Sequence, residues 1–320
     1  MILANICNGW KDIALYTPSL WAAIDADKPI SDLASLLDAW LRRAGSYALS
    51  ISLPTPLSSE IAAVVARYAH QLQVLQMYHH DDDDDDTDFS TAVWPLPFLK
   101  KLTIIGIHEY SCSISENLEI LRICSNLIEC TLDDVFYGYH GFNLEDILLL
   151  PRLCVFNFGA YPDHSSDLIL RYITLPGLQT LFISLHDIQF QDLLQFLRRS
   201  SPPLQQIIVG DAGFFDWTFE DLEECLPLLS TLTDFECLKP RGALPGDLLT
   251  VLATSPNLLL NLSTVTLRLL YIPTGPAAIR ETFQRPLVQA RPGEDITVQL
   301  RQLTADGMLI HLGPENRNYI

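Results

Sequence analysis

One short apolar motif recurs along most of this chain and constrains its fold more than any other feature. The motif consists of three apolar residues. The second lies three positions after the first, which we call the anchor, and the third lies two positions after the second. It occurs at Leu72–Leu75–Met77, Leu99–Leu102–Ile104, Leu127–Cys130–Leu132, Leu153–Phe156–Phe158, Leu178–Leu181–Ile183 and Leu204–Ile207–Val209, degenerates at Leu229–Leu232, and returns at Leu262–Val265–Leu267. Successive anchors are 27, 28, 26, 25, 26, 25 and 33 residues apart. Such a period predicts stacked units of similar structure.

The spacing inside the motif predicts a strand, because its last two apolar positions are two residues apart and point to one face. Residues 144–149 and 193–198, between motifs, have a helical pattern instead. Six of the seven anchor spacings fall in the leucine-rich-repeat range of about 20–29 residues, and 56 of the 320 residues are leucine. No repeat buries its apolar face alone. We therefore predict an α/β leucine-rich-repeat solenoid, a curved parallel sheet with outer helices.

Proline stands shortly before most anchors, at Pro97, Pro151, Pro176, Pro203, Pro227 and Pro256. Proline ends a helix and favours an extended backbone before it. The sequence thus predicts the corner between helix and strand in each repeat.

The two ends of the chain depart from the repeat. Apolar residues from Ile2 to Ala14 and from Leu33 to Ala44 have helical spacing, with Ser31 as the expected N-cap of the second helix and Gly45 at its end. We expect three parts: residues 1–46 as a short helical segment, 47–290 as the repeat array, and 291–320 as C-terminal capping strands. The aspartate-rich residues 81–88 are expected to form a solvated loop inserted in the array.

Charge and cysteine content exclude several classes of protein. With 39 acidic and 20 basic residues, the formal charge is −19, which disfavours nucleic acid and anionic membranes and favours basic segments of partner proteins. The apolar runs are too short to cross a membrane, and the start of the sequence does not resemble a signal peptide. The seven scattered cysteines predict reduced thiols rather than disulfides or zinc ligands. We expect an intracellular protein, cytoplasmic or nuclear.

Four stretches resemble the F-box proteins of fungi, particularly the mushroom type. Residues 6–14 (ICNGWKDIA) and 15–21 (LYTPSLW) are similar to that family's C-x-x-W-R-x-I-A and STPxLW stretches. Residues 37–46 (LDAWLRRAGS) resemble its WLxRSG helix, and residues 121–130 (LRICSNLIEC) resemble its LRxCPNLxEC repeat line. In the family, the F-box docks on a Skp-type adaptor of a cullin–RING ubiquitin ligase. The resemblance implies adaptor-binding roles for Ile6, Trp10, Ile13, Leu20 and Trp21.

The resemblance covers only the tail of an F-box, from Ile2 to Trp21. The LPxEIL stretch that opens the box in the family has no counterpart here. Two interpretations stay open: a chain that has lost adaptor docking, or a sequence that lacks an upstream exon.

No motif in the chain predicts catalysis. There is no GxGxxG, P-loop, HExxH or GxSxG sequence. His79 and His80 adjoin the aspartate run, but a flexible acidic loop lacks the fixed geometry of a selective metal site. We expect no cofactor, no metal and no enzymatic activity.

Partner recognition is expected on the concave side, where strand residues between the inward-facing apolar positions lie. The candidates there are Tyr78, Lys101, Glu129, Asp133, Asn157, Phe182, Gln206 and Ile208. Phe182 and Ile208 are expected at the same register on adjacent repeats, either as an apolar binding patch or covered by a flanking loop. A second candidate set lies in aromatic loops after the strands: Tyr137, Tyr139, Phe214, Phe215 and Trp217. These aromatic rings either form an interface with a partner or cover the core at the edge of the solenoid where the strands end.

These observations favour a non-catalytic protein-recognition module, by resemblance the substrate-binding F-box-like subunit of a cullin–RING ubiquitin ligase. The alternative is a stand-alone leucine-rich-repeat scaffold that does not dock on a ligase. Exposure of Trp10 and Trp21 would favour the first function, and their burial against the strand at Leu49 would favour the second.

Overall fold

The computed structural model describes residues 7–26, 32–55, 57–79, 95–105, 114–133, 147–158, 169–183, 190–209, 224–238, 259, 261–268 and 309–312. The chain divides into two compact units, Met1–Asn143 and Leu144–Ile320. Both units are mixed α/β structures built on parallel strands. The expected division at residues 46 and 290 stays a prediction.

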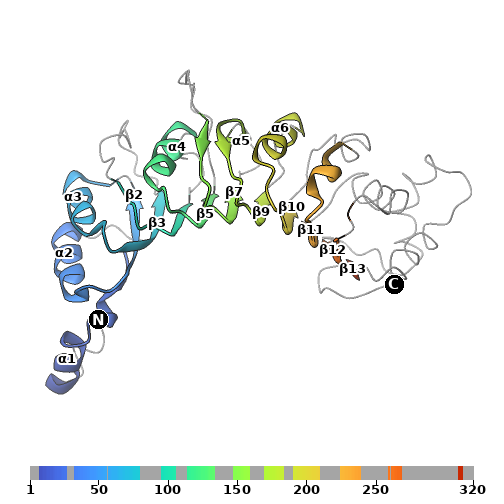
Figure 1. The fold of residues 1–320 in the computed structure, drawn as a ribbon. Coiled ribbons are helices and arrows are strands. Elements are labelled where there is room, and N and C mark those ends of the chain that lie inside the picture. The colour runs from blue at the N-terminus through green and yellow to red at the C-terminus, as the bar shows by residue number, and fades with distance from the viewer. Residues whose placement is uncertain are drawn as a thin grey trace, which may run out of the picture. The chain divides into compact units, whose positions relative to one another are not determined.

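The described part of the first unit contains five parallel strands, and their order in the sheet follows the chain, β1-β2-β3-β4-β5. Its elements are α1 (Asn8–Leu15), η2 (Pro18–Trp21, a 3₁₀ helix), β1 (Ala23–Asp25), α2 (Leu33–Ala44), β2 (Leu49–Thr55), α3 (Ser59–Tyr68), β3 (Leu72–His79), β4 (Lys101–Ile105), α4 (Ile114–Ile123) and β5 (Glu129–Asp133). Figure 1 shows α3 and α4 on one side of these strands.

The second unit has the same kind of arrangement, with parallel strands in the order β7-β9-β10-β11-β12-β13 and a small parallel pair, β6 and β8. Its elements are β6 (Leu148–Leu149), β7 (Val155–Phe158), α5 (Ile169–Tyr172), β8 (Ile173–Thr174), β9 (Thr180–Ile183), α6 (Phe190–Ser200), β10 (Gln206–Val209), η4 (Leu226–Leu229, a 3₁₀ helix), β11 (Asp234–Leu238), β12 (Thr264–Arg268) and β13 (Leu309–Leu312). Here α5 and α6 lie on one side of the strands (Figure 1).

The core positions of the motif align across neighbouring strands. In the first unit Leu75 is in register with Leu102, and Leu102 with Cys130. In the second, one row joins Phe156, Leu181, Ile207, Phe235 and Val265. All of these side chains are buried. The alternation along each strand therefore places one face against the core, as the motif predicts.

A tight turn precedes most of the strands and repeats along the chain. The backbone N–H of most anchors donates to the carbonyl oxygen three residues earlier, whereas that of Leu204 donates to the carbonyl oxygen of Pro202. The first of these two bonds joins Leu72 to Ala69, Leu99 to Leu96, Leu127 to Cys124, Leu153 to Leu150, Leu178 to Leu175, Leu232 to Leu229 and Leu262 to Leu259. Pro97, Pro151 and Pro176 occupy the second position of their turns, where the fixed φ of proline suits a β-turn.

A second backbone pattern joins several neighbouring repeats within each unit. The carbonyl oxygen that follows an anchor accepts two consecutive N–H groups from the next repeat. Lys100, Cys154, Gln179, Gln205 and Thr233 all accept in this way. Successive repeats therefore stack through the same contacts.

The seventh anchor is Leu232, and the expected anchor at Leu229 is wrong. Phe235 is in register with Ile207 and Val265, which makes the motif Leu232–Phe235–Cys237. The carbonyl of Leu229 is instead the acceptor of the turn. With Leu232 as anchor, the last two spacings, from Leu204 and to Leu262, become 28 and 30 residues.

The structure bears on several other parts of the sequence analysis. Helix α2 has Asp32 as its N-cap, so Ser31 does not cap it; Gly45 ends it with φ +63°, as expected. The helix predicted over residues 144–149 is wrong at its end, because Leu148 and Leu149 form strand β6 and pair with β8. Strand β1 was not expected. Residues 81–88 lie outside the described residues.

Candidate functional site

The segment formed by α1 and η2, which we call the amino-terminal segment (residues 8–21), exposes several large apolar side chains. Ile13 is 57% exposed, Tyr16 86% and Leu20 42%. A short helix in water normally buries its apolar positions. These side chains therefore form a candidate contact surface for a partner.

The amino-terminal segment is joined to the sheet through Trp21. The Trp21 indole N–H donates to the carbonyl oxygen of Ala14, at 2.7 Å, and both residues are buried. Trp21 also meets Trp40 edge-to-face, with 4.8 Å between ring centroids. The Arg43 guanidinium lies 4.6 Å from the centroid of Trp21, a cation–π contact. Trp40 in turn donates to the carbonyl of Ala23 in β1.

The structure thus separates the residues expected to bind an adaptor. Ile13 and Leu20 are exposed, whereas Trp21 is only 3% exposed and its ring is packed within the fold. Ile6 lies outside the described residues, and so does the side chain of Trp10. The candidate docking surface consequently rests on Ile13 and Leu20, with Trp21 as the residue that holds their segment in place.

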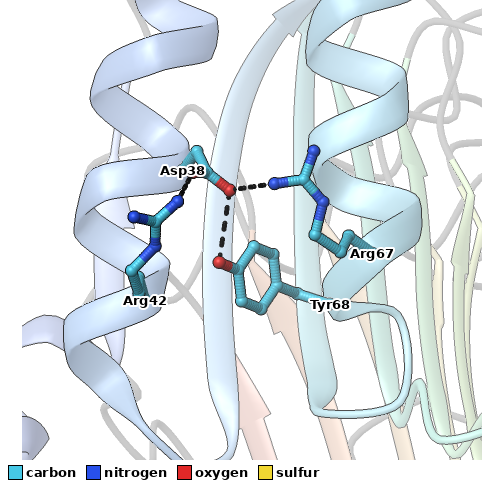
Figure 2. A network of polar contacts seen from close by, with 4 residues as sticks. All are labelled: Asp38, Arg42, Arg67 and Tyr68. Carbon is cyan, nitrogen blue, oxygen red and sulfur yellow. Dashed lines mark hydrogen bonds and ion pairs between the residues drawn. The ribbon is translucent and has the colours of Figure 1, made fainter.

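Helices α2 and α3, next to this segment, are clamped together by Asp38 (Figure 2). One oxygen of Asp38 accepts from Arg67 at 2.5 Å and from the Tyr68 hydroxyl at 3.2 Å, and the other accepts from Arg42 at 2.6 Å. Because Arg67 and Tyr68 belong to α3, the carboxylate fixes the two helices against each other.

The described polar candidates on the sheet face of the first unit each contact a polar neighbour. Lys101 and Glu129 are register partners, and their charged groups lie 2.9 Å apart. The Tyr78 hydroxyl donates to Gln76, which also accepts from Ser52. Opposite charges are therefore paired on this face. Asp133 is the last residue of β5, and its side chain lies outside the described residues.

The sheet face of the second unit carries the expected apolar pair. Phe182 and Ile208 are register partners on β9 and β10, and both side chains are half-buried. Asn157 is in register with Phe182, and Gln206 lies two residues before Ile208. Partial exposure leaves Phe182 and Ile208 available for contact. The sequence did not single out Asp234 and Glu236, which follow on β11 of the same face. When Leu232 is taken as the anchor of this motif, Asp234 and Glu236 occupy positions whose side chains point away from the core.

The aromatic loop candidates Tyr137, Tyr139, Phe214, Phe215 and Trp217 lie outside the described residues. Within the described ranges, no group of three His, Cys, Asp or Glu side chains is arranged to hold a metal ion. The helices described here include none long and apolar enough to span a membrane.

The thiols in the described part are free and mostly buried. Burial raises the pKa of Cys124 to about 12. Burial and the charge of Glu224 raise the pKa of Cys225 to about 12. The pKa of Cys130 is raised well above its usual value by burial and by Cys124. A thiol with a raised pKa is a weak nucleophile at neutral pH, so these three belong to the packing.

No protein-family model matches this chain, and no curated protein matches it.

Proposed function

We propose that the chain is a leucine-rich-repeat solenoid that acts as a non-catalytic protein-recognition module. In this proposal it is the substrate-binding, F-box-like subunit of a cullin–RING ubiquitin ligase. Its amino-terminal segment contacts a Skp-type adaptor, and its sheet face binds the protein substrate. The observation that carries the adaptor contact is the exposure of Ile13 and Leu20 on the segment that resembles the tail of an F-box.

The repeated backbone contacts support the solenoid assignment. Strand order follows chain order in both units, and the same turn precedes seven anchors. Anchor spacings remain near the leucine-rich-repeat length once Leu232 replaces Leu229. Each unit presents a face of parallel strands, which suits recognition of another protein.

The adaptor contact is tested by co-expressing the full chain with a Skp-type adaptor and purifying through a tag on the chain. Wild type is expected to retain the adaptor. Ile13→Asp and Leu20→Asp are expected to lose it, because a buried, unpaired carboxylate opposes association. Phe98→Asp is the matched control, since Phe98 is a 55% exposed apolar residue of the same unit. Loss of the adaptor in all three variants, or retention in all, contradicts the proposal.

A stand-alone scaffold is the second candidate function, and it is supported by the packing of Trp21 against Ala14 and Trp40 within the fold. In that case the amino-terminal segment caps the first strand of the sheet. Failure of wild type to retain any adaptor, together with a large loss of stability in Trp21→Ala, would favour the scaffold.

A further inference from the structure

The turn between α1 and η2 is built around Thr17. Its backbone has φ −114° and ψ 87°, close to the extended region, because a residue that precedes proline avoids the helical conformation. The Thr17 hydroxyl donates to the carbonyl oxygen of Ile13 in α1, at 2.6 Å. The Leu20 N–H in η2 donates to the carbonyl oxygen of Thr17, at 3.1 Å. Thr17 therefore joins the last turn of α1 to η2.

The surroundings of Thr17 are open to solvent. Its side chain is half-buried, and its neighbours Tyr16 and Leu20 are 86% and 42% exposed. The next residue is Pro18, and serine or threonine followed by proline is the target of proline-directed protein kinases. These kinases bind their substrate as an extended segment, a conformation that proline favours in the residue before it. Thr17 thus combines the target sequence with an accessible hydroxyl and a suitable backbone.

The structure distinguishes Thr17 from other residues that precede proline. Thr55–Pro56 and Ser201–Pro202 are dipeptides of the same kind. Thr55 is 3% exposed, and its hydroxyl donates to the carbonyl oxygen of Tyr78 in β3. Ser201 is exposed, but its φ of +42° lies in the left-handed region, so its backbone is not extended. Of these three sites, Thr17 alone has both an accessible side chain and a nearly extended backbone. A further pair, Ser255–Pro256, lies outside the described residues.

A phosphoryl group on Thr17 opposes the contacts that this residue makes. The modified oxygen has no hydrogen left to donate to Ile13. A phosphate carries about −1.5 to −2 charges at pH 7, and here it lies beside a carbonyl oxygen at the C-terminal end of α1, the negative end of the helix dipole. The last turn of α1 has no basic residue, and it contains Asp12. Charge repulsion therefore loosens this end of α1.

We propose that Thr17 is a phosphorylation site for a proline-directed protein kinase, and that its phosphorylation loosens α1 from η2. The Thr17 hydroxyl oxygen attacks the γ-phosphorus of ATP, which the kinase binds with Mg²⁺. A P–O bond forms at Thr17, and the bond from the γ-phosphorus to the β,γ-bridging oxygen breaks. The hydroxyl proton passes to a carboxylate of the kinase, and ADP leaves.

Loosening of α1 changes the contact surface of the amino-terminal segment. The Ala14 carbonyl oxygen accepts the Trp21 indole N–H at 2.7 Å and the Thr17 N–H at 3.4 Å. These two bonds hold α1 against η2, and they set the position of Ile13 relative to Leu20. Phosphorylation consequently weakens adaptor binding. This consequence rests on the proposed function, whereas the modification and the loosening of α1 do not.

The modification is tested with the purified full chain, a mitogen-activated protein kinase and ATP–Mg²⁺, and mass spectrometry locates and quantifies the phosphate. Short synthetic peptides centred on Thr17, Thr55 and Ser201 are the matched controls, because they keep each sequence and lack the fold. The rate at each site in the chain is divided by the rate in its peptide. We expect this ratio to be about tenfold or more higher for Thr17 than for Thr55, which a kinase reaches only when β2 opens locally. The ratio for Ser201 should also be low, because its turn is not extended.

The loosening of α1 is measured by hydrogen exchange of residues 8–21 in the phosphorylated chain. We expect the α1 amides to exchange several-fold faster after phosphorylation, and those of β2 and β3 to stay unchanged. Thr17→Val, treated with the kinase in the same way, is the matched control. Valine has the shape of threonine but lacks the hydroxyl, so the variant loses the hydrogen bond to Ile13 without gaining charge. Its α1 amides should exchange more slowly than those of the phosphorylated chain.

Two results overturn the inference: a ratio for Thr17 no higher than that for Thr55 or Ser201, or α1 exchange that phosphorylation leaves unchanged or slows. Neither measurement involves the adaptor. If wild type does not retain the adaptor but Thr17 passes both tests, the ligase function fails and this inference stands. If the unmodified chain retains the adaptor and Thr17 fails either test, only this inference falls. Equal retention of the adaptor by the unmodified and phosphorylated chains overturns the regulatory consequence.

Discussion

Gly177 lies so close to Pro151 of the preceding repeat that a Cβ atom on it would be 2.5 Å from the Pro151 carbonyl oxygen. Gly177 is the residue directly before the anchor Leu178. At the equivalent positions of other repeats, the Asn126 amide donates to the carbonyl of Pro97 at 2.6 Å, and the Asn261 amide donates to Ser230 at 2.8 Å. One position in the repeat thus governs how closely successive turns stack.

Replacing Gly177 by alanine is expected to destabilise the second unit by about 1–3 kcal/mol, because the obstructing atom is backbone and cannot rotate away. Gly9→Ala is the control. The nearest atom to a Cβ there is the Cys7 sulfur at 4.0 Å, and alanine favours a helix over glycine. Urea denaturation of both variants measures the difference. Equal stability of Gly177→Ala and wild type would contradict the close approach.

Removal of the Asp38 carboxylate is expected to loosen α2 from α3. Because the Arg42 and Arg67 side chains are 74% and 57% exposed, solvent screens both ion pairs, and we expect Asp38→Asn to lower the free energy of unfolding by about 1 kcal/mol. Arg42→Ala removes only a pair within α2, worth about 0.3–0.5 kcal/mol. A double-mutant cycle of Asp38 with Arg67 is measured by urea denaturation. A coupling energy near zero would contradict a stabilising contact between Asp38 of α2 and Arg67 of α3.

Much of the strand framework could be predicted from local spacing. The motif at Leu178–Leu181–Ile183 and its counterparts identify strands because burial on one face requires apolar residues two apart. The misplaced anchor at Leu229 shows the limit of this argument. Leu229 and Leu232 are both apolar and both buried, and only the pairing of Phe235 with Ile207 tells them apart. Strand β1 could not be predicted, because a strand of three residues is too short to show an alternation of apolar and polar residues.

The candidate site was predictable only in part, for a related reason. Register placed Phe182 beside Ile208 because both strands follow the same motif. Asp234 and Glu236 were missed because their positions depend on the corrected anchor. Exposure of Ile13 and burial of Trp21 both depend on where η2 packs, and the spacing of apolar residues in a short helix does not decide that.

Arg199 is expected to be irreplaceable by lysine. One nitrogen of its guanidinium donates to the carbonyls of Leu170 at 2.5 Å and Ile173 at 2.7 Å, and Nε donates to the Thr174 hydroxyl at 3.1 Å. Burial lowers the pKa of Arg199 from its usual value.

Because an ammonium group does not reproduce the planar fork that joins α6 to α5 and β8, Arg199→Lys should cost about 1–3 kcal/mol. Thermal unfolding followed by circular dichroism measures this. Arg198→Lys is the control, since Arg198 makes an exposed pair with Glu224 worth about 0–1 kcal/mol. Equal melting temperatures for the two variants would exclude a special role for Arg199.

The buried thiol of Cys225 predicts how stability changes with pH. Burial and Glu224 raise its pKa from 9.0 to about 12, so the thiolate forms first in the unfolded chain. The stabilising contribution is complete below pH 9 and is lost as the pH rises from 9 towards 12. Between pH 8 and pH 10 one such thiol should reduce the free energy of unfolding by about 1.4 kcal/mol. Urea denaturation of Cys225→Ala should show a pH dependence smaller by that amount. Leu229→Val, which perturbs the same buried region without removing a thiol, should keep the wild-type dependence. An identical pH dependence in wild type and Cys225→Ala would contradict burial of the thiol.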